Sequence, residues 1–240
     1  MKKLLSFLLL SAVLSASCRY VGGNRIKGDG NIVTESREAS GFSSIDVGGA
    51  IRIVLTQDSQ YAVKVETDSN LQPYIEVYVK GNTLYVHPED HTNPDATKDI
   101  IVYVNTPVIK EFDASGACHI RGQNKIVSDD EISIDLSGAS DIDLDLKAPK
   151  VDIELSGAST VKLRGETKDI SISGSGSSDI RAFDLLAENV DLDLSGASNA
   201  EVHASVKIRI EGSGASHVSY RGNAAVSSDM SGASSVKKVE

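Results

Sequence analysis

The chain has 240 residues, a formal net charge of −10 at pH 7, no tryptophan and two cysteines. An acidic chain without basic runs does not suit nucleic-acid binding, because that affinity depends on Lys and Arg neutralising phosphates. Two cysteines are too few for a disulfide framework or a zinc site, and nothing in the sequence indicates another cofactor.

Residues 1–17 have the features of an export signal. Two lysines precede an apolar run that ends at Leu14, which is shorter than the roughly 20 residues needed to cross a bilayer. Small residues follow, and then Cys18. Either Cys18 is lipidated as in a bacterial lipoprotein, or ordinary cleavage follows the small residues. We favour lipidation of Cys18 and hence a membrane contact through its lipid, although Leu14 lies four residues before it instead of the usual three.

Residues 28–114 are irregular but rich in strand patterns. Alternating apolar and polar residues predict strands at Tyr61–Glu66, Ile75–Val79, Leu84–His87 and Ile100–Asn105. The sequence KGNT at 80–83 predicts a hairpin turn, and 87–99 is a polar loop that contains prolines. We expect this half to form wide opening coils, continuous with the repeats that follow, and to protect one end of the stack from edge pairing.

From residue 115 the chain repeats Ser-Gly-Ala-Ser or a close variant. The first residue of each unit, here called the origin, recurs at intervals of 18 to 22 residues. The origins are Ser115, Ser137, Ser156, Ser175, Ser195, Ser213 and Ser231, with Gly48 as an earlier equivalent. A period near 20 residues without helical patterns predicts a β-solenoid.

Apolar residues recur at fixed distances from each origin, which predicts columns that face inward. Such columns stand five residues before the origin (Ile132 to Val226), three before (Ile45 to Ile210) and five after (Ile53 to Val236). Strands of successive coils must therefore pair in parallel and in register, with a spacing of about 4.8 Å.

The predicted fold is all-β: a right-handed parallel β-helix, or β-solenoid, with three sides, about 20 residues per coil and roughly ten coils. The expected organisation has a linker at 18–27, a single solenoid domain at 28–236 and a tail at 237–240. Within the domain, 28–114 are the irregular opening coils and 115–236 the regular repeats. At each repeated corner we expect glycine to supply a positive φ, alanine to lie inside the bend and serine to bond to the turn backbone.

An acidic column stands two residues before the origins. It reads Asp46, Asp113, Asp135, Glu154, Ser173, Asp193, Glu211 and Asp229. Stacked carboxylates could bind Ca²⁺, or each could accept hydrogen bonds from the neighbouring turn. We favour the second reading, because the acid always directly precedes the turn, and we predict no metal site.

Other candidates for chemistry are weak. Cys118 stands at the second serine position and is expected to be a small buried residue, not a nucleophile. His119 and His217 share a column but lie several coils apart, and the column six after the origin mixes charges like a solvated face. No catalytic residues are predicted. If a glycan binds, the region around Tyr74 and Tyr78 is the best candidate.

The chain resembles the family called "putative auto-transporter adhesin, head GIN domain". The resemblance rests on "GFSSID" at 41–46, "NLQPYI" at 70–75 and the Ser-Gly-Ala units that follow them, and it spans about 28–236. It implies an exported β-helical protein of the bacterial surface or periplasm, and it carries over no catalytic residues.

The expected function is that of a non-enzymatic cell-envelope lipoprotein, with a rigid solenoid that serves as an adhesin or surface scaffold. The alternative is a β-helix that binds or processes glycans. We expect export to the outer membrane or cell surface, with the periplasm as the alternative. The partner, protein or glycan, and the oligomeric state are not predicted.

Overall fold

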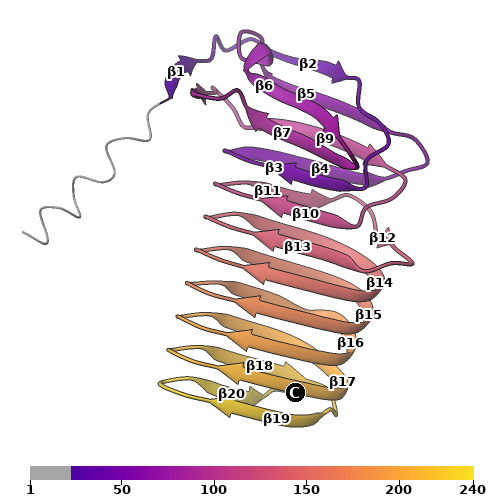
Figure 1. Cartoon of the computed structure of the whole chain (residues 1–240), viewed down its shortest axis with the longest axis vertical. Helices are drawn as coiled ribbons and strands as arrows, with labels where there is room; N and C mark the ends of the chain where they lie inside the picture. Colours follow the sequence, from indigo (N-terminus) through magenta and orange to yellow (C-terminus); the bar gives the residue numbers. More distant parts are fainter. Residues whose placement is uncertain (1–22) are drawn as a thin grey trace, which may run out of the picture.

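The structure is a computed structural model that describes residues 23–240, so Cys18 and the predicted export signal lie outside the described residues. It is a stack of short coils under a cap made by the N-terminal half (Figure 1). The stack is a β-solenoid of about six turns with roughly 20 residues per turn. This confirms the predicted fold class, although not the expected ten coils.

The regular part is built from strands that wrap around each coil. They are β10 (Glu111–Ala114), β11 (His119–Gly122), β12 (Ile126–Val127), β13 (Ile132–Leu136), β14 (Asp141–Leu155), β15 (Thr160–Gly174), β16 (Asp179–Leu194), β17 (Asn199–Gly212), β18 (His217–Arg221), β19 (Ala225–Met230) and β20 (Ser235–Lys238). Each long strand, such as β14, runs along one face, bends, and returns along the other. A coil therefore has two broad faces and a short third side.

The Ser-Gly-Ala-Ser turns lie directly over one another and form a vertical column that we call the seam, on the left in Figure 1. The amide of Ala158 donates to the carbonyl of Gly138 at 2.7 Å, and Ala139 bonds to Gly116 in the same way. Gly157 has a φ of +78°, as the turn requires. A Cβ on Gly157 would collide with the carbonyl oxygen of Gly138 one coil away, so glycine is needed for space as well as for conformation.

The small residues of the seam are placed differently from our prediction. Ala158 is exposed, whereas the second serine, Ser159, is completely buried. Its hydroxyl donates to the carbonyl of Ser156 at 2.9 Å, and the same bond recurs in the later coils. The inside of the bend is therefore the serine's place, because there its hydroxyl satisfies a carbonyl oxygen of the turn. Cys118 occupies the equivalent position and is buried as predicted.

Inside the coils, the predicted apolar columns form the core. The column three before the origin, from Ile45 to Ile210, is buried throughout, and so is the column five after it down to Val218. The prediction fails in the last coil, where Val226 is 44% exposed and Val236 is only partly buried. No further coil of the described chain covers that end.

Variation in repeat length is absorbed on the third side, which we call the edge and which lies opposite the seam. The pairing of β15 with β16 shifts between Lys162 and Arg164. The pairing of β16 with β17 shifts between Ala182 and Leu186 and again between Ala187 and Asn189. The seam stays in register through all of these bulges. The intervals of 18 to 22 residues therefore differ only where the chain rounds the edge.

The N-terminal half caps the stack. Its elements are β1 (Asn24–Lys27), β2 (Ile32–Arg37), β3 (Ser44–Val47), β4 (Ile51–Gln57), β5 (Ala62–Asp68), the 3-10 turn η2 (Gln72–Tyr74), β6 (Ile75–Lys80), β7 (Thr83–Pro88), β8 (Thr92–Asp95) and β9 (Ile100–Thr106). The four predicted strands and the β6–β7 hairpin are all present. Residues 24–27, expected in the linker, instead pair with β8, and Lys237 and Lys238, expected in the tail, belong to β20.

The order of the cap strands in space differs from their order along the chain. One level, formed by β3 and β4, lies between β7 and β9 on one side and β10 and β11 on the other. Beyond that level, β5 joins β2 and β9 in antiparallel pairs. The opening half is therefore not a series of wide coils. Antiparallel strands replace further coils there, which explains why about six turns are present.

A buried carboxylate holds the outer loops of the cap together. Asp68 is completely buried and accepts hydrogen bonds from the amide of Gly30 at 2.6 Å and from the amide and hydroxyl of Thr97 at 2.9 and 2.7 Å. Burial would raise the pKa of Asp68, but the bonds from Thr97 and Gly30 outweigh it and lower the pKa. Asp68 therefore stays ionised and joins two loops that are distant in sequence.

Candidate functional site

One broad face of the solenoid carries the predicted acidic column in register. Asp46 lies beside Asp113, Asp113 beside Asp135, and Asp135 beside Glu154. The ladder continues through Ser173, Asp193, Glu211 and Asp229. The parallel pairing of identical coils thus places a carboxylate at nearly every level.

The carboxylates do not cap the turns, contrary to our prediction. No carboxylate of this column accepts a hydrogen bond from a turn amide or a serine hydroxyl within residues 23–240; Asp46 instead contacts His87 Nε2 at 2.8 Å. The pKa of Asp113 is raised by partial burial and by its neighbours Asp46, Asp135 and Glu111. The ladder is therefore a self-repelling array that the turns do not neutralise.

A second outward column on the same face lies four residues before the origins. It reads Ser44, Glu111, Ser133, Asp152, Ser171, Asp191, Arg209 and Ser227 in register. The two columns together, which we call the acidic face, carry ten carboxylates and one guanidinium, a formal charge of −9. The formal charge of this one face is thus nearly as large as the net charge of −10 of the whole chain.

The opposite face is close to neutral. Its equivalent columns, four and six after the origin, hold five Lys or Arg and four Asp or Glu, and we call it the paired face. Arg164 contacts Asp143 at 2.7 Å and Arg181 contacts Asp179 at 2.7 Å. The mixed charges predicted for the column six after the origin are present, and Lys162 contacts Asp143 within that column at 3.8 Å.

Aromatic residues gather in the cap. Tyr78 and Tyr85 stack with ring centroids 5.2 Å apart and an angle of 12° between the rings. Tyr78 is 45% exposed, whereas Tyr74 is half-buried in η2. Tyr85 pairs in register with Asp46, so the stacked rings continue the acidic column upward. The sequence indicated Tyr78, but the partner Tyr85 is known only from the pairing of β6 with β7.

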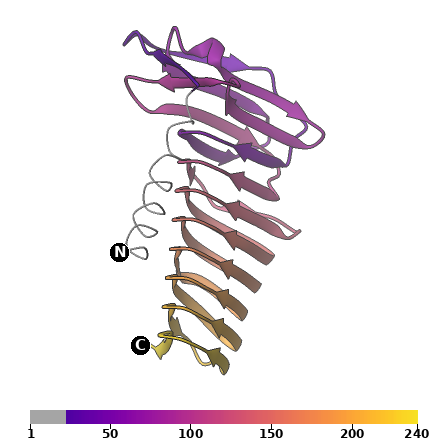
Figure 2. The ribbon, with the colours of Figure 1, turned by 60° about the vertical axis from the view of Figure 1, so that its left-hand side comes forward.

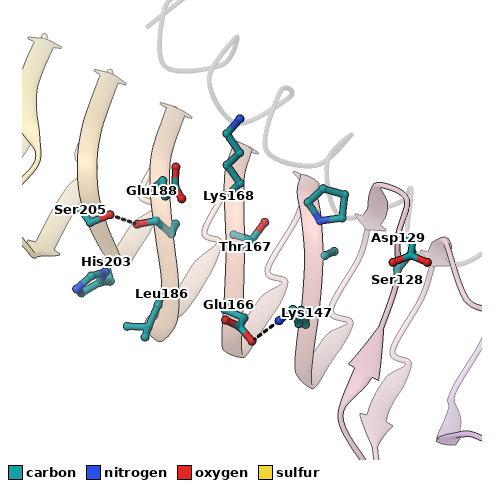
Figure 3. Close-up of a pocket in the computed structure, with 13 residues that line it drawn as sticks. Ser128, Asp129, Lys147, Glu166, Thr167, Lys168, Leu186, Glu188, His203 and Ser205 are labelled. Atoms are coloured by element: carbon teal, nitrogen blue, oxygen red, sulfur yellow. Dashed lines mark hydrogen bonds and ion pairs between the residues drawn. The ribbon is translucent and has the colours of Figure 1, made fainter.

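A shallow groove of about 630 Å³ follows the edge (Figure 3). Lys147 and Glu166 form an ion pair of 3.1 Å on one wall, where Leu186 and His203 continue the column. Lys168 and Glu188 project from the other side of the groove in Figure 3. The sequence analysis missed this groove, because the bulges that shape it appear there only as unequal repeat lengths.

The described residues show no assembled catalytic or metal centre. No group of three or more His, Cys, Asp or Glu side chains in 23–240 is arranged to hold a metal ion. His217 Nδ1 contacts Ser235 Oγ at 2.8 Å, but no carboxylate of the described chain bonds to this histidine to complete a triad. The buried Cys118 donates to the carbonyl of Ser115 at 3.2 Å, and burial raises the pKa of its thiol.

Known proteins that resemble this chain point to one family. The family described as "Putative auto-transporter adhesin, head GIN domain" matches residues 41–224, well over half of the chain. The chain belongs to this family. A search of curated proteins finds no match for this head GIN chain.

Three crystal structures have the same fold as this head GIN chain. A protein described as a putative adhesin from Bacteroides fragilis has a TM-score of 0.83 and 21% identity, over 89% of this chain and 100% of its own. Putative adhesins from Parabacteroides merdae and Parabacteroides distasonis have TM-scores of 0.72 and 0.70 and identities of 22% and 26%. Each covers 90% of this chain, with 99% and 100% of its own length matched.

Proposed function

We propose that this head GIN protein is an exported, non-enzymatic lipoprotein of the cell envelope, anchored through Cys18, whose rigid solenoid acts as an adhesin or surface scaffold. The observation that carries the proposal is the continuous register of the coils, which produces two flat faces several coils long. Such faces suit contact with a large partner. Family membership and the export signal at 1–17 support the same role.

Membrane attachment is assigned to the lipid on Cys18. Within residues 23–240, the structure contains no helix that is both long and apolar enough to span a bilayer. A lipid chain adds about 0.8 kcal/mol of membrane affinity per buried CH₂, so the multiple chains of a bacterial lipoprotein hold firmly. We place the protein at the outer membrane or cell surface, with the periplasmic side as the alternative.

The anchor is tested by cell fractionation and protease shaving of intact cells. Cys18→Ala should move the protein from the membrane to the soluble fraction and remove it from the cell surface. Cys118→Ser is the matched control, since it removes the other cysteine at a position where serine recurs in later coils, and it should leave the partition unchanged. Unchanged membrane partition of the Cys18→Ala protein would contradict lipidation.

Adhesion is tested separately on cells that carry or lack the gene. Cells with the protein should adhere more strongly to wells coated with extracellular proteins, and Cys18→Ala cells should behave like cells that lack it. Equal adherence of all three strains would refute the adhesive role and leave the anchoring result intact.

The second candidate is glycan binding, which the exposed Tyr78 ring on Tyr85 favours. Aromatic faces are a common platform for apolar surfaces of a ligand. A glycan array probed with the wild-type protein and with Tyr78→Ala separates the two candidates. Binding that disappears with Tyr78 would favour the glycan, and an empty array would remove it.

A further inference from the structure

The exposed aromatic pair and the acidic face form one continuous surface. Tyr78 pairs with Tyr85, Tyr85 with Asp46, and Asp46 with Asp113, all in one outward column. Tyr78 is also the only aromatic among the exposed large hydrophobic residues of the described chain. A π-face and a carboxylate both attract cations, so two independent features of this surface favour the same chemistry.

Most of the acidic face lacks a partner within the described chain. Six of its ten carboxylates make no ion pair within residues 23–240: Glu111, Asp113, Asp135, Glu154, Asp193 and Asp229. On the paired face, by contrast, lysines and arginines neutralise the acids directly. Partial burial raises the pKa of Asp113, and the repulsion from Asp46, Asp135 and Glu111 raises it further.

The shape of the surface favours an extended ligand. The carboxylates follow one another at the strand spacing of about 4.8 Å, so the eight levels from Asp46 to Asp229 extend over about 34 Å. A metal ion needs several ligands that converge on one point, and no such group is present in residues 23–240. A polypeptide of about ten extended residues has the same length as the ladder.

We propose that the acidic face, together with Tyr78 and Tyr85, docks an extended lysine- or arginine-rich segment of a partner protein. The basic side chains lie along the carboxylate ladder, and one of them stacks on the exposed ring of Tyr78. Glu154 and Asp193, on either side of Ser173, contribute to a groove of about 400 Å³ that receives one such side chain. The proposal specifies the partner chemistry for the adhesive function proposed above and rests on that function only for its biological purpose.

Binding is measured by biolayer interferometry between the purified protein and a ten-residue lysine peptide, with a ten-residue glutamate peptide as the negative probe. Two quadruple variants change the charge equally on opposite faces. The acidic-face variant is Asp113→Asn, Asp135→Asn, Glu154→Gln and Asp193→Asn. The paired-face variant is Asp141→Asn, Asp143→Asn, Asp179→Asn and Glu201→Gln.

We expect the wild-type protein to bind the lysine peptide, more weakly as salt is raised. The acidic-face variant should lose about tenfold or more in affinity, and the paired-face variant no more than about threefold. Tyr78→Ala should weaken the affinity of the protein for the lysine peptide by a few-fold. Circular dichroism establishes that each variant is folded, and the acidic-face variant should fold well because it loses repulsion.

Equal loss in the two quadruple variants would overturn the proposal, because it would mean attraction to net charge alone. Absence of binding to the lysine peptide would overturn it as well. An unchanged affinity of Tyr78→Ala would overturn the aromatic contact. None of these results bears on anchoring through Cys18, so failure here and failure of the proposed lipoprotein are distinguished.

Discussion

The seam and the edge connect the same two faces of every coil, but they differ in how much they allow the chain to vary. At the seam, each turn bonds to the turn above it through the same backbone atoms. At the edge, bulges add or remove residues, and Figure 2 shows that the coils stay stacked nevertheless. The cap strands β5 to β9 enter between Gln57 and β10, so they form the largest of these edge insertions. A repeat protein can therefore diversify at one corner if another corner maintains the register.

The strongest test of this contrast is insertion of Gly-Ser at each corner. Between Ala158 and Ser159, the insertion would break the backbone column of the seam and should cost more than about 4 kcal/mol or prevent folding. Between Ser205 and Val206, on the exposed edge, it should cost less than about 1 kcal/mol, because loop lengthening is cheap. Urea unfolding measures both, and equal costs would refute the distinction.

The next test separates space from conformation at a seam glycine. Gly157→Ala should destabilise the protein by about 3 kcal/mol or more. The added Cβ would collide with the backbone of Gly138, and alanine would also have to adopt the positive φ of this turn. Gly41→Ala is matched in φ, at +77°, but has no atom within 4 Å of the added Cβ, and should cost only about 1–2 kcal/mol. The difference in free energy of unfolding measures the crowding of the seam alone.

A smaller loss of stability is expected at Gln57, where the chain leaves the edge and enters the cap. Gln57 Nε2 donates to the carbonyls of Pro107 and Val127 at 3.0 and 2.9 Å, and its Oε1 accepts from the amide of Val127 at 2.7 Å. The side chain thus joins both ends of the insertion to the next coil. Gln57→Ala should cost about 1–2 kcal/mol, and the exposed Gln60→Ala should cost almost nothing. A thermal melt of both variants decides; equal midpoints would show that the bonds are dispensable.

The smallest effect concerns the strands that lead into the seam, and it depends on pH. Because the folded pKa of Asp113 is raised, the native state binds more protons than the unfolded state just above pH 3.8. Its contribution to stability is full below that pH and is lost as the pH rises through the folded pKa. Asp113→Asn should therefore stabilise the protein at pH 7, by less than about 1 kcal/mol at this exposed site, and not below pH 4.

The matched control for this prediction lies on the paired face. Asp143→Asn removes the carboxylate that Arg164 contacts at 2.7 Å, so it should lower the melting temperature at pH 7. A fall in melting temperature for both variants would show that Asp113 is not repelled by its neighbours.

Much of the coiled region could be predicted because each coil repeats the same pattern over itself. Ile134 and Ile153 recur at the same distance from the seam, and in-register stacking is the arrangement that buries both columns. The acidic ladder followed from the same argument. What it bonds to did not follow, because the side-chain contacts of Asp46 depend on His87, which comes from a strand 41 residues away.

The solenoid, its seam and its apolar columns could be derived from the amino-acid sequence, since these features depend on spacing within one repeat. The position of β3 between β7 and β10 could be learned only from the folded chain, because alternation predicts a strand but does not specify its neighbours. The folded chain also shows that Ser159, and not Ala158, lies inside the bend. Both residues are small enough for that place, but only the serine has a hydroxyl that can donate to the carbonyl of Ser156 there.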